Sequence, residues 1–205
     1  MNKKMSCALF ALLIAVASLV SACATTGGGE ECPISPDGAV KAMPAGTKDF
    51  PMSELPPPAN EADRKYLGLS GGGNFPVRQI KAQVVIVEVF SFYCPHCQRT
   101  AAQINDLYRM IEARADLKGK VKLIGIGAKN SAFEVDAYRE RYHVPFPLFP
   151  DEEMVLTEKL GVKGTPTFIG IRMAENGAPR QFYFGEGGFA DNQKFLTEII
   201  RLSGL

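Results

Sequence analysis

The chain has 205 residues, of which 23 are basic and 22 acidic, so its formal net charge is +1. This near-neutral balance argues against nucleic acid as a partner, because such partners require a concentration of positive charge. It also gives no support for a membrane surface that holds the protein by electrostatic attraction. The length and the hydrophobic share of 46% suit one folded domain with an ordinary core.

The first residues predict export from the cytoplasm. Lys3 and Lys4 form a short basic region, and Cys7 to Val20 is a stretch of 14 residues without a charge. This stretch is too short for an ordinary membrane span and fits the apolar part of a secretory signal. The domain is therefore expected outside the cytoplasm, where disulfides persist.

The end of this stretch, Val20-Ser21-Ala22-Cys23, resembles the lipobox of bacterial lipoproteins. The resemblance implies cleavage before Cys23 and lipidation of Cys23, which would anchor the protein to a bacterial membrane facing the periplasm or the cell exterior. Two alternatives remain open. One is an ordinary signal peptide cut at a nearby small residue such as Ala22 or Ala24, and the other is an uncleaved membrane anchor.

A segment rich in proline and glycine follows. Residues 24–60 hold seven prolines and five glycines, and their few apolar residues recur at no structural period. Such a composition favours a flexible tether over a domain. The predicted organisation is a lipoprotein signal peptide, a lipidated cysteine with a flexible tether, and one domain, over residues 1–22, 23–60 and 61–205.

The domain opens with a short helix and a buried strand. Asn60 is placed to cap a helix through Leu67. Val84 to Phe90 is too apolar and too β-branched to face water on one side, which predicts a buried strand. A helix is expected next, because apolar residues recur at spacing i, i+3, i+4, i+7. They are Ile104, Leu107, Tyr108 and Ile111.

Further elements alternate in the same way. Val121 to Ile126 is a second predicted strand. Ser131 and Glu134 form a capping-box pattern that begins a helix towards Tyr142, which Pro145 ends. A short strand from Phe146 to Phe149 is expected after it. Asp151 is then expected to cap a further helix, which ends near Gly161.

The last part predicts a hairpin and a helix. Thr167 to Arg172 and Arg180 to Phe184 are strands around the turn Glu175-Asn176-Gly177. Asp191 caps the final helix, whose apolar residues are expected to face inward. They are Phe195, Leu196, Ile199, Ile200 and Leu202. Strands that alternate with helices and then give a hairpin and a helix predict an α/β fold with a mixed sheet.

The most informative motif is Cys94-Pro95-His96-Cys97, where the first main strand leads into a helix. Two cysteines at this spacing are placed for thiol–disulfide exchange. Backbone N–H groups and the positive dipole end of the helix favour a thiolate at Cys94. Half of a zinc site has the same spacing, but no second ligand pair follows. If Cys23 is lipidated and Cys94 pairs with Cys97, Cys32 is left over. A free thiol and a pairing between molecules remain open for Cys32, and we interpret it as an incidental linker residue.

This order of elements resembles the thioredoxin fold. Glu88 lies six residues before Cys94, where thioredoxin-like proteins place a buried Asp or Glu beneath the second cysteine. Thr165-Pro166, just before a strand, resembles the cis-proline loop of that family, which lies against the disulfide. The resemblance covers about residues 60–205 and implies a mixed central sheet flanked by helices.

Two branches of the family share features with the chain. The sequence from Glu88 to Cys97 is similar to the oxidase DsbA around its active site. The 72 positions between Cys94 and Pro166 instead resemble the TlpA and ResA group of redoxin-like, membrane-tethered periplasmic oxidoreductases. Residues 131–149 would supply the extra helix–strand unit that this spacing accommodates.

The peroxidase pattern P-x-x-x-[ST]-x-x-C is missing from the region of the two cysteines. It requires a proline seven residues before the reactive cysteine. Val87 stands there relative to Cys94, and Phe90 relative to Cys97. The sequence therefore predicts disulfide exchange and argues against peroxidase chemistry.

The thiols are expected to divide the work. Cys94 would be the exposed nucleophile, with its thiolate stabilised by helix N–H groups and by His96. Cys97 would be the buried resolving thiol. Glu88 would relay a proton to or from Cys97, because a buried carboxyl can be tuned towards neutral pH.

Substrate contacts are expected beside the nucleophile. The resemblance implies that Pro166 blocks misligation of the thiolates and that the backbone of Thr165 pairs with an extended client segment. Tyr93 holds the position before Cys94 and is expected at the same surface. The predicted partners are client proteins with thiols or disulfides and a membrane or periplasmic redox partner, and the exchange requires no cofactor and no metal.

A metal-binding alternative comes from the Sco-type copper chaperones, which share this fold and bind copper through two cysteines and a distant histidine. His143 would be that histidine. Their cysteines are spaced C-x-x-x-C, and this chain has one residue fewer between them. His143 lies at a predicted helix end beside Tyr142, with no ligand partner nearby in the sequence, so we interpret it as structural. We interpret Phe146 and Phe149 as core residues and not as part of a binding site.

Overall fold

The structure is a computed structural model that describes residues 48–51, 54–173 and 178–205. The predicted signal peptide, Cys23, Cys32, most of the predicted tether and the turn Glu175-Asn176-Gly177 lie outside the described residues. Within these ranges, no helix combines the length and the apolar character that a membrane span requires.

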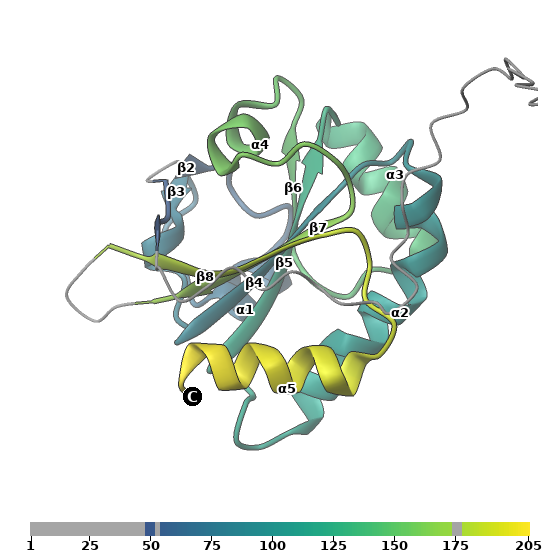
Figure 1. The fold of residues 1–205 in the computed structure, drawn as a ribbon. Coiled ribbons are helices and arrows are strands. Elements are labelled where there is room, and N and C mark those ends of the chain that lie inside the picture. The colour runs from purple at the N-terminus through teal and green to yellow at the C-terminus, as the bar shows by residue number, and fades with distance from the viewer. Residues whose placement is uncertain (1–47, 52–53, 174–177) are drawn as a thin grey trace, which may run out of the picture. The chain divides into compact units, whose positions relative to one another are not determined.

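The described part of the chain contains a mixed six-stranded sheet in the order β1-β8-β7-β4-β5-β6 (Figure 1). β4, β5 and β6 are parallel to one another, whereas β7 runs antiparallel to β4 and β8 antiparallel to β7. The strands span Lys48–Asp49 (β1), Val84–Phe90 (β4), Val121–Ala128 (β5), Leu148–Asp151 (β6), Thr167–Arg172 (β7) and Arg180–Glu186 (β8).

Helices cover both faces of this sheet. One apolar core lies between the sheet and α2, α3 and α5, and a second lies beneath α1, α4 and a small two-stranded sheet, β2 with β3. The remaining elements span Glu54–Leu55 (β2), Glu61–Leu67 (α1), Phe75–Pro76 (β3), Val77–Gln79 (η1, a 3₁₀ helix), Pro95–Ala113 (α2), Ala132–Tyr142 (α3), Val155–Leu160 (α4) and Asn192–Ser203 (α5).

The central strand β4 confirms the prediction of a strand without a solvent face. All seven of its residues are buried, because helices pack on both sides of it. Side chains alternate between the faces of a strand. Val85, Val87 and Val89 therefore belong to the core beneath α1 and α4, while Ile86 and Phe90 belong to the core beneath α2. Because it alternates with Val87 and Val89, Glu88 lies on the same face of β4 as Ile86 and Phe90, the face towards α2.

The extra helix–strand unit predicted between the cysteines and the cis-proline loop is present as α3 and β6. Ser131 and Glu134 form the expected capping box at the start of α3. β6 pairs parallel with β5 and extends the sheet. The strand lies two residues later than predicted, because Pro145 and Pro147 interrupt the backbone N–H donors before it. Phe146 instead fills the core beneath α2.

Helix α4 begins later than its sequence suggested. Asp151 was expected as the N-cap, but it is the last residue of β6, and Met154 holds the cap position. The carboxylate of Asp151 still accepts hydrogen bonds from the backbone of Leu156 at 3.0 Å and of Thr157 at 2.7 Å. Asp151 therefore satisfies the first turn of α4 from outside it.

The end of the domain follows the prediction closely. β7 and β8 pair as the expected hairpin strands, and the Asp191 side chain caps α5 through the backbone of Lys194. Phe195, Leu196 and Ile199 are buried. Ile200 and Leu202 are only partly covered, so the inward face of α5 is narrower than its sequence suggested.

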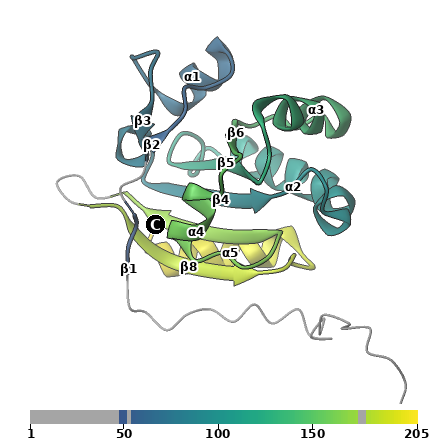
Figure 2. The ribbon, with the colours of Figure 1, turned by 90° about the horizontal axis from the view of Figure 1, so that it is seen from above.

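The folded region starts before the predicted boundary at residue 61. β1 pairs with β8 at the edge of the large sheet (Figure 2), and the backbone of Phe50 donates to the carbonyl of Pro179 at 2.8 Å. Phe50 and Leu55 are buried in the core beneath α1 and α4. Their apolar side chains cover a part of the sheet that would otherwise face water. The free energy gained by this burial outweighs the tendency of the proline-rich composition around them to remain unfolded.

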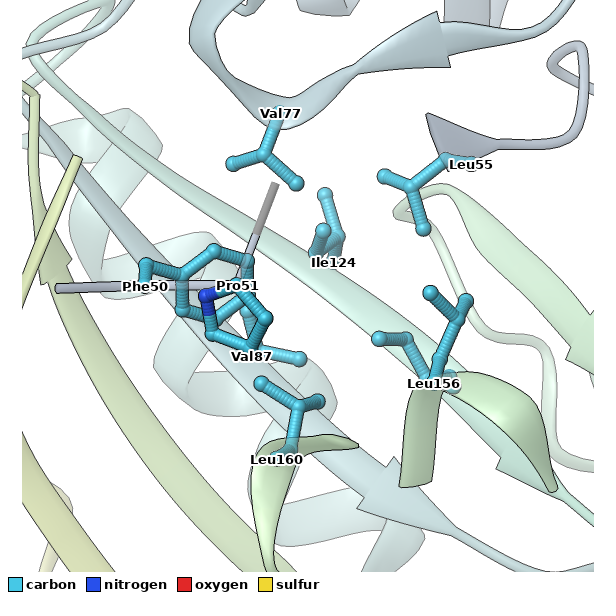
Figure 3. Close-up of a pocket in the computed structure, with 9 residues that line it drawn as sticks. Phe50, Pro51, Leu55, Val77, Val87, Ile124, Leu156 and Leu160 are labelled. Atoms are coloured by element: carbon cyan, nitrogen blue, oxygen red, sulfur yellow. The ribbon is translucent and has the colours of Figure 1, made fainter. Parts of the chain in front are cut away.

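A small apolar pocket lies in this second core, between β2, η1 and α4 (Figure 3). No residue of the CxxC motif lines it. Its lining consists of Phe50, Pro51, Leu55, Val77, Val87, Ile124, Ile126, Leu156 and Leu160. With apolar side chains on every side, it offers no group that could direct chemistry.

Candidate active site

The two cysteines lie at the start of α2. Cys94 is the N-cap residue and Pro95 the first residue of the helix, a position that tolerates proline because its N–H would have no helical partner. The backbone N–H of Cys97 donates to Cys94 Sγ at 3.3 Å. Both cysteines are free thiols, so the structure represents the reduced protein at this site.

The surroundings of Cys94 favour its thiolate. Partial burial raises the pKa of Cys94, but hydrogen bonds from the Thr165 side chain, from Cys97 and from the backbone N–H of His96 outweigh it. The net pKa lies below the ordinary value of a cysteine. In its protonated form the thiol donates to the carbonyl oxygen of Thr165 at 3.2 Å. Cys94 therefore faces the loop that precedes β7.

Cys97 has the opposite character. Its side chain is fully buried. Burial raises the pKa of Cys97 well above its ordinary value, and the hydrogen bond with Cys94 raises it further. One thiol is thus partly exposed with a lowered pKa, while its neighbour is enclosed and protonated at neutral pH. This pairing suits an attacking thiol and a thiol that acts second.

Glu88 lies within electrostatic reach of both cysteines. Only 2% of its surface is exposed, and its Oε1 atom has no hydrogen-bond partner in the described part of the chain. Burial, with a smaller effect of the Cys94 charge, raises the pKa of Glu88 to about 8. The Glu88 charge in turn raises the pKa of Cys97. A carboxyl with this pKa can give or take a proton near neutral pH.

The Thr165–Pro166 peptide bond is cis, as the resemblance to the thioredoxin fold implied. The loop is fixed on its far side, where the backbone of Gly187 donates to the carbonyl of Pro166 at 2.8 Å. On its near side, the Thr165 carbonyl meets the thiol of Cys94. The structure thus brings Cys94, Thr165 and Pro166 together from segments about 70 residues apart.

His96 contacts the site differently from its prediction. Its backbone N–H is a donor to Cys94. Its imidazole faces the loop between β8 and α5, where a side chain at Gly188 would begin 3.4 Å from Nε2. The contribution of His96 to the lowered pKa of Cys94 therefore comes from its backbone, beside the larger contributions of Thr165 and Cys97.

Tyr93 is 65% exposed beside the nucleophile. Its hydroxyl donates to the carboxylate of Glu134, the same residue that closes the capping box of α3. The ring packs edge-on against Phe92. The residue predicted to meet clients is thus held to the inserted helix by its hydroxyl while its ring faces solvent.

Two residues at the site have no counterpart in the sequence-based prediction. Tyr138 in α3 donates its hydroxyl to the carbonyl of Cys97 at 3.0 Å. Asn130, fully buried before α3, accepts from the backbone of Phe92 at 2.7 Å. Both contacts join residues about 40 positions apart, so no local sequence pattern predicts them.

His143, the residue that the copper alternative requires, is the C-cap of α3 with a left-handed backbone. Asn105 in α2 donates to its carbonyl at 3.3 Å. In the part of the chain that the structure describes, no group of three or more His, Cys, Asp and Glu side chains is arranged to hold a metal ion.

The sheet order, the cysteines at the start of α2 and the cis-proline loop define a thioredoxin-like protein. More particularly, the chain belongs to the AhpC/TSA family, whose model matches residues 54–188, about two thirds of the sequence. The match begins at β2 and so includes residues 54–60, the last part of the predicted tether.

The relatives are consistent with this class. The thiol-disulfide oxidoreductase ResA of Halalkalibacterium halodurans is 24% identical over 98 residues, which are 48% of this chain and 53% of that protein. The match therefore spans about half the length of this curated relative.

Solved structures share the fold at low sequence identity. A secreted disulfide oxidoreductase of Mycobacterium tuberculosis, homologous to DsbE of E. coli, is 14% identical, with a TM-score of 0.52 over 73% of this chain and 96% of its own. The thioredoxin domain of a thiol-disulfide oxidoreductase from Bacteroides vulgatus is 11% identical, with a TM-score of 0.51 over 74% and 94%. A conserved protein from Geobacillus kaustophilus is 14% identical, with a TM-score of 0.58 over 80% and 85%.

Proposed function

We propose that this protein is a thiol–disulfide oxidoreductase that exchanges disulfides with client proteins outside the cytoplasm. The observation that carries the proposal is the asymmetry of the two thiols. Cys94 is partly exposed and its pKa is lowered, whereas Cys97 is buried and its pKa is raised. Near them lies the buried carboxyl of Glu88, whose pKa is raised to about 8. Relatives named as disulfide oxidoreductases support the proposal.

The chemistry follows from this asymmetry. In the reducing direction, the Cys94 thiolate attacks one sulfur of a client disulfide; the client S–S bond breaks and a Cys94–client disulfide forms. The released client thiolate takes a proton. Cys97 then attacks Cys94, the mixed disulfide breaks and the second client thiolate leaves. The client gains two electrons, and Cys94 and Cys97 become a disulfide.

Glu88 has a defined part in the second step. Cys97 must lose its proton before it attacks, and burial makes this costly. The ionised form of Glu88, which is the minor form at pH 7 because the pKa is about 8, is the proton acceptor that the buried site provides, and in the reverse direction Glu88 returns the proton. A redox partner, a dithiol or disulfide protein at the membrane or in the periplasm, resets the couple after each turnover.

Thr165, Pro166 and Tyr93 are the proposed client contacts. Tyr93 directly precedes Cys94 in the chain, and the Cys94 thiol donates to the carbonyl of Thr165, the residue before Pro166. An extended client segment that pairs with the backbone of Thr165 would bring its own sulfur to Cys94. The bulk of Pro166 keeps other ligands from the thiolates.

Trapping of the mixed disulfide tests the exchange reaction. A Cys97→Ala variant retains the nucleophile but lacks the second thiol, so disulfides between Cys94 and client proteins should accumulate and disappear on reduction. The matched control is Cys94→Ala, which should trap none. Equal trapping by both variants, or none by Cys97→Ala under conditions in which the wild type turns over, contradicts the proposal.

Alkylation at neutral pH tests the order of the thiols independently of any client. In the reduced protein, iodoacetamide should modify Cys94 at least tenfold faster than Cys97, because only Cys94 combines exposure with a lowered pKa. Peptide mapping by mass spectrometry assigns the adduct. Faster modification of Cys97 would reverse the two roles.

We further propose that Cys23 is lipidated and tethers the domain to a bacterial membrane. The lipobox-like sequence ending at Cys23 supports this anchoring. The mature protein should partition into detergent, and Cys23→Ser should release it or block its processing. Partitioning unchanged by that substitution would favour an uncleaved anchor.

A further inference from the structure

Tyr138 connects the inserted helix to the redox motif. Its hydroxyl donates to the backbone carbonyl of Cys97 at 3.0 Å, and only 2% of the residue is exposed. Its ring packs on Phe90, the last residue of β4, with centroids 4.5 Å apart. A buried phenol therefore spans from α3 to the first turn of α2.

The environment of this phenol is the reactive centre itself. After burial, the charges of Glu88, Cys97 and Cys94 are among the causes that raise the pKa of Tyr138 far above its usual value. Tyr138 consequently remains a neutral donor throughout the physiological range. The carbonyl that it binds belongs to Cys97, the more deeply buried of the two cysteines.

Another tyrosine shows what a purely structural role looks like. Tyr183 in β8 is buried to the same 2% and packs edge-on against Phe195 at 5.6 Å. It belongs to the same apolar core as Tyr138. Unlike Tyr138, it has no hydrogen bond to α2 among the contacts of the described residues.

We propose that Tyr138 is a positioning residue for Cys97: its hydrogen bond fixes the backbone of the resolving thiol so that the sulfur stays aligned with Cys94. This inference rests on the proposed exchange reaction and deepens it. The inserted unit of α3 and β6 then belongs to the active site and does more than extend the sheet.

The effect is confined to the second step of exchange. When Cys94 attacks glutathione disulfide, its S–S bond breaks, Cys94–S–S–glutathione forms and one glutathione leaves as thiolate. Cys97 then gives its proton to Glu88 and attacks Cys94, and the second glutathione leaves. Tyr138 touches no group that changes bonding in the first step, whereas the second step needs Cys97 in register.

The experiment uses Tyr138→Phe, which removes one oxygen and keeps the ring, with Tyr183→Phe as the matched control. Reduced full-length protein is mixed with glutathione disulfide, quenched with acid and analysed by peptide mass spectrometry. The Cys94–glutathione adduct should persist about 2- to 10-fold longer in Tyr138→Phe, the range expected for one hydrogen bond. Adduct formation should change less than twofold.

Equilibrium with glutathione provides a second readout. The Cys94–Cys97 disulfide should be disfavoured by the same factor in Tyr138→Phe, and a tenfold change corresponds to about 30 mV for this two-electron couple. Tyr183→Phe should leave both quantities at wild-type values. The assignment is overturned if Tyr138→Phe and Tyr183→Phe give the same adduct lifetime and the same redox equilibrium. It is also overturned if Tyr138→Phe slows the formation of the Cys94–glutathione adduct as much as the attack of Cys97 on it.

If Tyr138→Phe fails to fold, Thr100→Val tests the same carbonyl of Cys97. Thr100 Oγ1 donates to the same Cys97 carbonyl at 3.3 Å and also to the His96 carbonyl at 3.1 Å. Its loss should lengthen the adduct lifetime in the same direction but less. No change in Thr100→Val would then contradict the role of this carbonyl. A wild type that forms no adduct at Cys94 would instead overturn the exchange reaction itself.

Discussion

The two faces of β4 are equally buried but differ in chemistry. Beneath α1 and α4, Val85, Val87 and Val89 meet other apolar side chains. On the side of α2, Glu88 is buried without a partner for Oε1, near a protonated thiol. Burial of an unpaired polar group is costly, and here it creates a proton acceptor.

This difference separates stability from chemistry within one strand. The apolar face can fill its space with close-packed side chains and gain stability from each of them. The face towards α2 keeps an ionisable group in a poor environment, and the proposed exchange reaction uses the altered pKa of that group. Substitutions on the two faces should therefore change different measurable quantities.

The largest effect on stability is expected in the core that the apolar face of β4 shares with its neighbouring strands. Phe149 in β6 is fully buried and packs edge-on against Phe75. Phe149→Ala should lower the free energy of unfolding by about 3–5 kcal/mol, the usual cost of such a cavity. Urea unfolding measures the loss, and glutathione equilibrium should give an unchanged potential for Cys94–Cys97. A shifted potential would break the separation of the two faces.

The next effect has the opposite sign. Glu88→Gln should increase the free energy of unfolding by about 3 kcal/mol at pH 7, because the native state no longer has to keep a carboxyl protonated. The same variant should slow the attack of Cys97 by about a hundredfold, since it lacks the proton acceptor. Urea titrations and the lifetime of the Cys94–glutathione adduct measure the two effects.

The pH dependence gives this prediction its control. The ordinary pKa of Glu88 is 4.5 and the folded value about 8. Below pH 4.5 both states are protonated and the two proteins should be equally stable. As the pH rises from 4.5 to 8, the unfolded wild type releases the proton first, so the wild type loses stability relative to Glu88→Gln. A difference that does not vary across this window would contradict the raised pKa.

A smaller effect separates the backbone of His96 from its side chain. His96→Pro removes the N–H that donates to Cys94, whereas His96→Ala retains it. We expect a wild-type potential of roughly −220 to −120 mV on the scale of known oxidoreductases. The proline variant should be more reducing by about 30 mV, a tenfold change, and the alanine variant by less than half of that. Equal shifts would assign the effect to the imidazole.

The smallest effect is expected at Tyr93. Tyr93→Phe removes the hydroxyl that donates to Glu134, and this hydrogen bond is the main cause that lowers the pKa of Glu134. That pKa should rise towards its ordinary value, which carboxyl NMR titration would detect. Because the residue is exposed, the free energy of unfolding should change little. A larger loss would mean that the bond supports the start of α3.

Local patterns were sufficient for much of the fold and of the site. The apolar run that forms β4, the capping box of α3 and the cap of α5 each depend on neighbours within a few positions. The Cys94–Cys97 motif and the cis bond before Pro166 are also local. These features are visible in sequence because the residues that cause them are adjacent.

Features that depend on distant partners were not predicted. Phe50 and Leu55 join the domain because they cover sheet formed by later residues. Asp151 caps α4 from within β6, which depends on where that strand ends. Tyr138 reaches Cys97 across 41 positions, so its role follows only from the packing of α3 on α2.

The edge strand β6 has a consequence for association between copies of the protein. Pro150 lies within it, in register with Gly127 of β5. Proline has no backbone N–H, so another strand that aligned along this edge would face a missing donor. Exposed strand edges are common sites of aggregation, and a proline blunts them. The unit that contains Tyr138, the proposed positioning residue, thus also protects the sheet from unintended extension.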